Sequence, residues 1–126
     1  MKIIHTPDGP APAGHYSQAV VYGGVVYVAG MLGMDPKSPD ADVGDATQQT
    51  RQALANVETV LKEAGSGLHR AIRMTIYVSD ISMWGDVNEV FAEVMGDHKP
   101  ARAIVPVQNF KGDCVVEIVA TAALGG

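Results

Sequence analysis

The chain reads Pro100-Ala101-Arg102-Ala103-Ile104-Val105-Pro106-Val107 and then, after a polar segment, Cys114-Val115-Val116-Glu117-Ile118-Val119-Ala120. Both runs are apolar and rich in β-branched residues, which is typical of strands. The first run contains one arginine and the second contains one glutamate. A charge inside a strand is costly to bury unless it has a partner or a ligand. Arg102 and Glu117 are therefore candidate partners for each other or for a bound molecule.

The segment between the two runs, Asn109 to Asp113, is typical of a turn, so we predict that the runs form a hairpin. If Arg102 lies opposite Val119, the two charged residues share one face, with Cβ atoms roughly 7–8 Å apart. That gap suits a salt bridge inside the sheet, or a small carboxylate and a water molecule. A shift of one residue in the register instead places the two side chains on opposite faces.

Composition limits the class of protein. The length of 126 residues predicts a single domain, residues 1–126, and 47% apolar with 18% charged residues is ordinary for a globular chain. The single cysteine cannot form an intrachain disulfide. No apolar run is long enough for a signal peptide or a membrane span, so we expect a cytoplasmic protein without a membrane partner. The net charge of −5 argues against a nucleic-acid partner.

Two segments have helical patterns with one apolar side. In the first, Leu54, Val57 and Leu61 form a stripe, Asp45 is a candidate cap and Gly65 a candidate stop. In the second, the stripe consists of Trp84, Val87, Phe91 and Val94, and we expect Trp84 in the core.

The remaining patterns predict strands and loops. Residues 71–79 alternate, with Ile72, Met74, Ile76 and Val78 on one side. The full prediction is a short strand at 2–4, a loop at 7–14, strands at 16–22 and 25–30 joined by Gly23-Gly24, an acidic loop at 31–44, a helix at 45–64, a strand at 71–79, a helix from Asp80 or Ser82 to about Met95, and the two closing strands.

This order, β-β-β-α-β-α-β-β, predicts an α+β fold with a mixed sheet and both helices on one face. The other face of the sheet would then carry Tyr77, Val115 and Val119 without a helix to cover them. Self-association is the simplest way to bury such a face, so we expect an oligomer.

Several segments together resemble one known family. Pro100-Ala101-Arg102 before an apolar strand, Val116-Glu117-Ile118 in the last strand, Gly14-His15-Tyr16-Ser17-Gln18-Ala19 near the start, and Val87-Asn88 in the second helix resemble the RidA/YjgF family of reactive-intermediate imine deaminases. The strand ending at Gly30 and the helix from Thr50 to Gly65 agree, so the resemblance covers nearly the whole chain.

The resemblance implies a chorismate-mutase-like fold and a homotrimer. In such trimers three sheets surround a barrel-like core, and a site lies in each cleft between subunits. The implied reaction is hydrolysis of 2-enamine or 2-imino acids, such as 2-aminoacrylate, to 2-keto acids and ammonia. It needs no metal and no organic cofactor.

The resemblance also assigns roles to residues. Arg102 would bind the substrate carboxylate, which suits the two parallel hydrogen bonds of a guanidinium. Glu117 would position the water. Tyr16 and Ile104 would line the pocket and contact the substrate, Asn88 would border it, and the Gly30 backbone amide would face the ligand.

The chain departs from the family pattern at three places. Ala29-Gly30-Met31 stands where archetypes have Ser-Gly-Gln, Ile104 stands where cysteine is frequent, and His15 replaces a proline. We therefore expect a more apolar pocket that makes fewer hydrogen bonds to its substrate.

The departures leave other functions open. One alternative is a non-catalytic sensor that binds a small carboxylate through Arg102. Another is a pathway-specific deaminase of the same fold. RNA cleavage, a third, is disfavoured by the acidic net charge.

Overall fold

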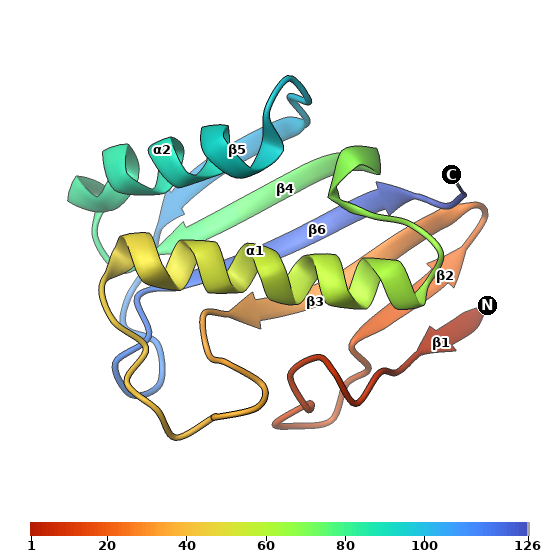
Figure 1. Ribbon diagram of the computed structural model, residues 1–126, viewed down its shortest axis with the longest axis horizontal. Coiled ribbons are helices and arrows are strands. Elements are labelled where there is room, and N and C mark those ends of the chain that lie inside the picture. Colours follow the sequence, from red (N-terminus) through yellow and green to blue (C-terminus); the bar gives the residue numbers. More distant parts are fainter. Residues whose placement is uncertain (126) are drawn as a thin grey trace.

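The computed structural model of the protein describes residues 1–125. Its strands and helices follow the predicted order. Figure 1 shows the two helices lying across one sheet. Two short 3-10 turns, η1 and η2, precede β4 and α2. The elements are β1 (Lys2–Ile4), β2 (Ala19–Tyr22), β3 (Val25–Leu32), α1 (Ala46–Glu63), η1 (Leu68–Arg70), β4 (Ala71–Val78), η2 (Ile81–Met83), α2 (Trp84–Met95), β5 (Ala101–Pro106) and β6 (Val116–Ala123).

The six strands form one mixed sheet in the order β1-β2-β3-β6-β4-β5. β4 and β5 are parallel, and every other neighbouring pair is antiparallel. The α+β fold with a mixed sheet and two helices is therefore confirmed.

The predicted hairpin between the last two strands is wrong. β4 lies between β5 and β6, pairing with both of them. The segment from Val107 to Val115 therefore passes over the end of β4, where the Val107 amide donates to the Val78 carbonyl at 2.8 Å. The chain bends at Lys111 and turns at Gly112 and Asp113, within the predicted turn segment, but a turn signal does not say which strands its ends will join.

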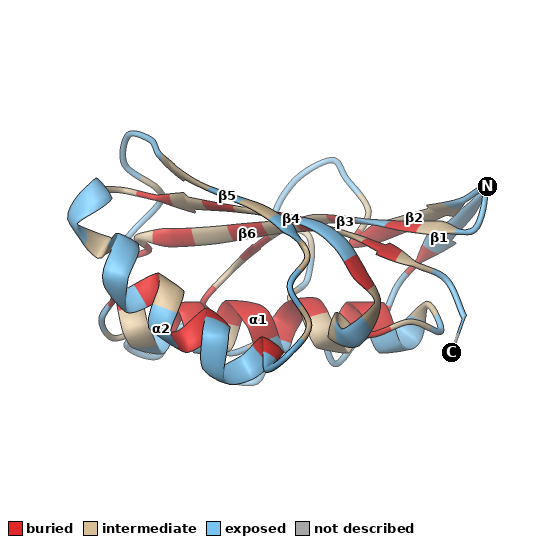
Figure 2. Cartoon of the chain, turned by 90° about the horizontal axis from the view of Figure 1, so that it is seen from above, coloured by how far each residue is buried: buried red, intermediate tan, exposed pale blue. Residues whose placement is uncertain are grey.

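Both helices pack on the same face of the sheet (Figure 2). Leu54, Val57 and Leu61 of α1 are fully buried there, as predicted, against sheet residues such as Ile76 and Ile118. Burial alternates along β6, which is the pattern of a strand with one face in a core. The core therefore lies between the sheet and α1 with α2.

The ends of α1 agree with the prediction. The Asp45 side chain accepts a hydrogen bond from the Gln48 amide, and the Gln48 side chain accepts one from the Asp45 amide, each at 2.9 Å. This capping box satisfies amides that no helical carbonyl reaches. After the C-cap residue Ala64, Gly65 has φ +85°, a conformation that favours glycine.

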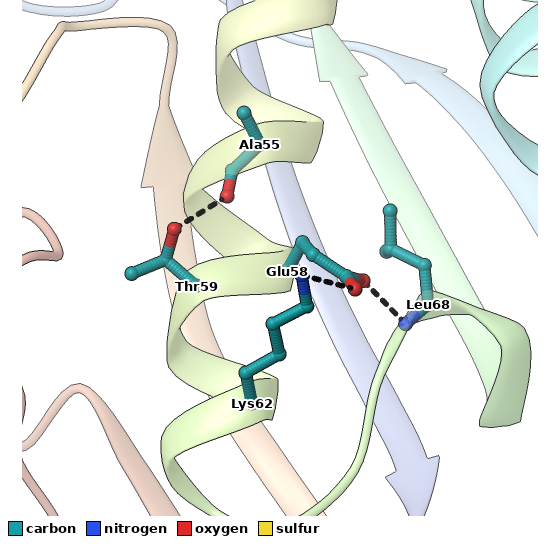
Figure 3. A network of polar contacts seen from close by, with 5 residues as sticks. All are labelled: Ala55, Glu58, Thr59, Lys62 and Leu68. Carbon is teal, nitrogen blue, oxygen red and sulfur yellow. Dashed lines mark hydrogen bonds and ion pairs between the residues drawn. The ribbon is translucent and has the colours of Figure 1, made fainter.

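The outer side of α1 is also tied to the next element. Glu58 accepts a hydrogen bond from the Leu68 amide at 2.6 Å and pairs with Lys62 at 3.6 Å (Figure 3). The Thr59 hydroxyl donates to the Ala55 carbonyl one turn earlier at 3.0 Å. Glu58 thereby joins the helix to the turn that leads into β4.

Three apolar residues expected on the inner side are exposed, and one of them, Val94 of α2, is 37% exposed. Trp84 is 45% exposed, because Asp80 caps the 3-10 turn at 81–83 and α2 begins only at Trp84. Ile72 is 47% exposed, because the pairing of β4 with β6 shifts between Ala71 and Arg73. This irregularity turns Ile72 away from the core, whereas the rest of the alternation in β4 is confirmed.

The first hairpin differs from the prediction at both outer ends. β2 begins at Ala19 rather than residue 16, because the Gln18 side chain is buried and bonds the backbone of Thr6 and Pro10. β3 continues to Leu32, so the acidic loop is shorter than expected. Met31 is buried in the core, so this departure from the family pattern does not point into a pocket.

Neither α1 nor α2 covers the second face of the sheet (Figure 2). It carries Tyr27, which is 50% exposed, together with the half-buried Thr75, Tyr77 and Val119. We call this surface the open face. Neither α1 nor α2 combines the length and the hydropathy that a membrane-crossing helix needs.

Candidate functional site

Arg102 is held by aromatic rings at the edge of the sheet. It lies on edge strand β5 in register with Met74, a buried residue on the helix side. Its guanidinium carbon lies 5.0 Å from the centre of the Phe91 ring and 5.8 Å from the centre of the Trp84 ring. At these distances both rings attract the cation, so α2 fixes the direction of the guanidinium.

Asn88 lies beside Arg102. The two residues line one hollow of about 420 Å³, together with Phe91, His98 and Lys99. The His98 ring contacts the Ala71 carbonyl through Nε2 at 2.8 Å, so its position is fixed. The hollow thus combines a guanidinium, an amide and an ammonium, which suit the binding of an anion.

Ile104 follows Arg102 on the same side of β5, but it serves the core. Its side chain is partly buried against the hydrophobic cluster, and it does not line the hollow of Arg102.

Glu117 lies on the open face in a second hollow, of about 410 Å³. It is in register with Leu32 on one side and Tyr77 on the other. Tyr16, Leu32, Phe110 and Lys111 line the same hollow. Burial raises the pKa of the Glu117 carboxyl above its usual 4.5. A raised pKa suits a group that takes a proton and returns it.

Gly30 lies directly against the Glu117 carboxyl group. A Cβ atom at this position would be 2.7 Å from Cδ of Glu117 and 3.0 Å from each carboxylate oxygen. The pairing of β3 with β6 is irregular between Val28 and Met31, which leaves the Gly30 backbone beside the carboxylate. A side chain at position 30 would therefore require the Glu117 carboxyl group to move from its present position.

Tyr16 stands at the wall of the Glu117 hollow, 51% exposed. Its hydroxyl oxygen accepts a hydrogen bond from the Ala13 amide at 3.1 Å. The neighbouring His15 is exposed, as expected for a residue in a solvated loop.

The structure separates Arg102 from Glu117 within one chain. Arg102 aligns with Met74 of β4, and Met74 aligns with Ala120 of β6. Arg102 and Glu117 are therefore separated by two strand spacings across the sheet and by three positions along the strand. Their Cα atoms are thus about 14 Å apart, and the register gives them opposite faces. The predicted diagonal pair does not form, because β4 lies between the two strands.

Sequence reasoning missed the groups that support these side chains. Gln49 is buried on α1; its amide group donates to the carbonyls of Gly44 and Asp113 and accepts from the Val115 amide, at 2.7–3.0 Å. It therefore fixes the segment that enters β6. The only signal was a glutamine on the inner side of a helix, where a polar group needs partners.

Other reactive groups in residues 1–125 do not form a metal site. No group of three or more His, Cys, Asp or Glu side chains there is placed to hold an ion. Cys114 is buried, and burial, followed by the nearby Asp113 and Glu117, raises the pKa of its thiol. A thiol held in this neutral state is a poor nucleophile.

Comparison with known proteins gives consistent matches over the full length. The family described as Endoribonuclease L-PSP matches residues 6–124. A RutC family protein of Pyrococcus horikoshii is 40% identical, over 96% of this chain and 96% of its own length. A rat protein named 2-iminobutanoate/2-iminopropanoate deaminase is 36% identical, over 98% of this chain and 90% of its own.

The fold matches as well as the sequence. The crystal structure of RidA from an Antarctic Psychrobacter superposes with a TM-score of 0.92 at 33% identity, covering 98% of this chain and 100% of that one. Both the sequence and the structure therefore assign the chain to one family. The chain belongs to the RidA/YjgF family, the family described as Endoribonuclease L-PSP.

Proposed function

We propose that the protein hydrolyses reactive 2-enamine and 2-imino acids to 2-keto acids and ammonia. The observation that carries the proposal is the half-buried Glu117 carboxyl, with a raised pKa, lying against Gly30 in a hollow. Relatives named 2-iminobutanoate/2-iminopropanoate deaminase, 36–37% identical to this chain, support the same reaction.

The proposed site lies between two copies of the chain in a homotrimer. Arg102 and Glu117 have opposite faces and lie in separate hollows, so one chain does not offer both to a small substrate. The open face supplies a surface for a second copy, which brings its own edge strand and Arg102. Burial of the exposed aromatic residues there favours the assembly.

The proposed reaction proceeds in two steps. Arg102 of one copy binds the substrate carboxylate, and Asn88 beside it helps to orient the imine. Glu117 of the other copy takes a proton from a water molecule, whose oxygen bonds to the imine carbon. Glu117 then returns this proton to the nitrogen, which gives a carbinolamine with an amino group and a hydroxyl group on one carbon. Glu117 next moves the hydroxyl proton to the nitrogen as the carbon–nitrogen bond breaks, so that ammonia leaves and a 2-keto acid remains. The protein supplies orientation and proton transfer, and the reaction as written uses no metal or organic cofactor.

The substitutions within the family pattern affect the surroundings more than the reacting groups. Met31 and Ile104 pack toward the core, and Ala29 packs against it. The substitutions therefore leave the Glu117 hollow with its tyrosine and glutamate. A sensor that binds a small carboxylate would need Arg102 but not the raised pKa of Glu117, so we favour the enzyme.

The first test is a coupled assay. Threonine dehydratase generates 2-iminobutanoate, and formation of 2-oxobutanoate is followed spectroscopically with and without this protein. We expect acceleration that Arg102→Ala or Glu117→Ala lowers by at least about a hundredfold, because each removes a group that acts in the transition state. Ligand binding without any acceleration would contradict the enzyme and support the sensor.

Mixing the two inactive variants tests the location of the site. Arg102→Ala and Glu117→Ala chains, unfolded and reassembled together at equal amounts, would form some interfaces with both intact groups. Random assembly predicts recovery of about a quarter of the wild-type activity. No recovery in mixed trimers would show that each site lies within one chain. The cytoplasmic location stays a prediction, for which cell fractionation is the test.

A further inference from the structure

The Glu117 hollow contains a cation that the proposed reaction does not use. Lys111, in the segment between β5 and β6, lines this hollow with Glu117, Tyr16 and Asn109. Glu117 is the one acidic residue among the lining residues, and Lys111 is the one basic residue. The two charges are therefore candidate contacts for different parts of a ligand.

Lys111 is not the ion-pair partner of Glu117. The ion pairs within residues 1–125 are Arg51 with Glu93 and Lys62 with Glu58, so no carboxylate there lies within 4.0 Å of the Lys111 ammonium. A close ammonium would lower the pKa of the Glu117 carboxyl, whereas that pKa is raised and burial is the cause. Lys111 thus remains available to an anion that enters the hollow.

The backbone on both sides of Lys111 is fixed. Gln49 bonds the Asp113 carbonyl at 3.0 Å and the Val115 amide at 2.7 Å, and the Val107 amide donates to Val78. The lysine is therefore mounted on an anchored segment, and its flexible stem lets the ammonium reach into the hollow.

We propose that Lys111 binds a second carboxylate, so that the preferred substrates are 2-imino dicarboxylic acids of four or five carbons. This proposal rests on the proposed function, in which Arg102 of another copy binds the first carboxylate. The hollow of about 410 Å³ on one chain lies within the range of small-molecule sites, roughly 300–1,000 Å³, and its lining offers a cation beside the Glu117 carboxyl. A hydrogen bond between charged groups then adds affinity for the longer diacid.

The experiment compares two substrates. 2-Iminoglutarate is generated from glutamate by an amino-acid oxidase with catalase present, and 2-iminobutanoate by threonine dehydratase. We expect kcat/KM for 2-iminoglutarate to be about tenfold or more above that for 2-iminobutanoate, the usual effect of one charged hydrogen bond. Lys111→Met should lower this ratio by about the same factor, and Lys111→Arg should keep most of it.

A matched control uses a lysine outside the hollow. Lys37→Met, in the exposed 34–44 loop, should leave both rates unchanged. Equal losses of Lys111→Met on the two substrates would overturn the proposal, since that pattern indicates a structural role for the segment. The proposal would also be overturned if Lys111→Met left the ratio of the two kcat/KM values unchanged.

A binding measurement separates this proposal from the proposed reaction. Calorimetry with 2-oxoglutarate and 2-oxobutanoate, the corresponding keto acids, reports the diacid preference without turnover. One outcome is that the protein accelerates hydrolysis of neither imine but binds 2-oxoglutarate more tightly than 2-oxobutanoate, and that Lys111→Met abolishes this difference. This outcome would refute the deaminase and retain the role of Lys111. Normal hydrolysis of 2-iminobutanoate without diacid preference in either experiment would refute only the role of Lys111.

Discussion

At the scale of single residues, Glu117 occupies a place where its charge is unfavourable. Its carboxyl group is half-buried on an apolar strand, and no ammonium or guanidinium of residues 1–125 forms an ion pair with it. The raised pKa is the result, because burial disfavours the charged form. Groups with this combination of burial and perturbed pKa are frequent at catalytic sites.

Glu117→Gln should change how the stability of the protein depends on pH. Because the folded pKa of Glu117 lies above the unfolded value, its contribution to stability is fully present below the unfolded pKa and is lost as the pH rises through the folded pKa. At pH 7 the neutral variant should therefore unfold at equal or higher urea concentration than the wild type, and this difference should vanish toward pH 4. Urea titrations at both pH values measure it. A variant clearly less stable at pH 7 would contradict the prediction.

The wild-type kcat/KM should also decrease as the pH falls through the raised pKa of Glu117. The reason is that only the ionised carboxylate accepts a proton from water. The midpoint of this decrease should lie above 4.5, the usual pKa of glutamate. A pH profile measured on the assembled protein, with the generating enzyme in excess at every pH, tests this expectation.

Gly30→Ala should displace the Glu117 carboxyl group. The new methyl carbon would lie 2.7 Å from Cδ, so the carboxylate must move away from its present position. We expect a loss of about ten- to a hundredfold in kcat/KM, since small displacements of catalytic groups have effects of this size. Gly85→Ala on α2, where a Cβ meets nothing within 4 Å, is the matched control and should keep full activity. Equal activity of the two variants would refute a positioning role for Gly30.

At the scale of elements, α2 holds the guanidinium of β5. Phe91 and Trp84 are seven residues apart, so they lie on the same side of the helix, and both rings contact Arg102. Phe91 is buried and also belongs to the core, whereas Trp84 is 45% exposed. The contact with Arg102 is thus one structural role of the Trp84 ring.

Trp84→Leu should weaken substrate binding more than folding. An exposed cation–π contact contributes about 0.5–1 kcal/mol, so we expect KM to rise about two- to fivefold with little change in kcat. Trp84→Phe retains a ring and should recover most of the affinity. Steady-state kinetics with thermal denaturation of each variant measures both effects. A fall in thermal stability that accounts for the whole activity loss would contradict the positioning role.

At the scale of the whole molecule, the open face is a sheet surface that neither α1 nor α2 covers (Figure 2). Its exposed or half-buried apolar residues lie on the side of the sheet opposite both helices (Figure 2). An apolar sheet face of this extent marks an interaction surface. The proposed trimer would bury it and would also bring Arg102 of one copy to Glu117 of another.

Val119→Glu should dissociate the assembly. Val119 lies on β6 on the open face, and burying a charge between apolar sheets is costly. Sedimentation velocity should show a smaller species, and hydrolysis should be lost in the same samples because the proposed site needs two copies. Ala55→Glu, on the exposed side of α1, is the control and should remain assembled. A dissociated but active Val119→Glu protein would refute the link between assembly and activity.

Local patterns in the sequence determined the elements and their order. The α1 helix is marked by a capping box, an apolar stripe and a terminal glycine, all set by residues within one or two turns. The glycine pair at 23–24 likewise marks the turn between β2 and β3. One-sided stripes on both helices favour a sheet with both helices on the same face, as observed (Figure 2).

The tertiary structure alone decided how the two charged strands are arranged. Strand pairing depends on residues far apart in the chain, and placing β4 between β5 and β6 completes a parallel unit with α2 over the core. This insertion gives Arg102 and Glu117 opposite faces, which no local pattern specifies. The partners of Gln49 and the ring contacts of Arg102 are non-local in the same way. The sequence by itself identified Arg102 and Glu117 as the candidate groups, whereas the long-range packing determined that a single chain holds them apart.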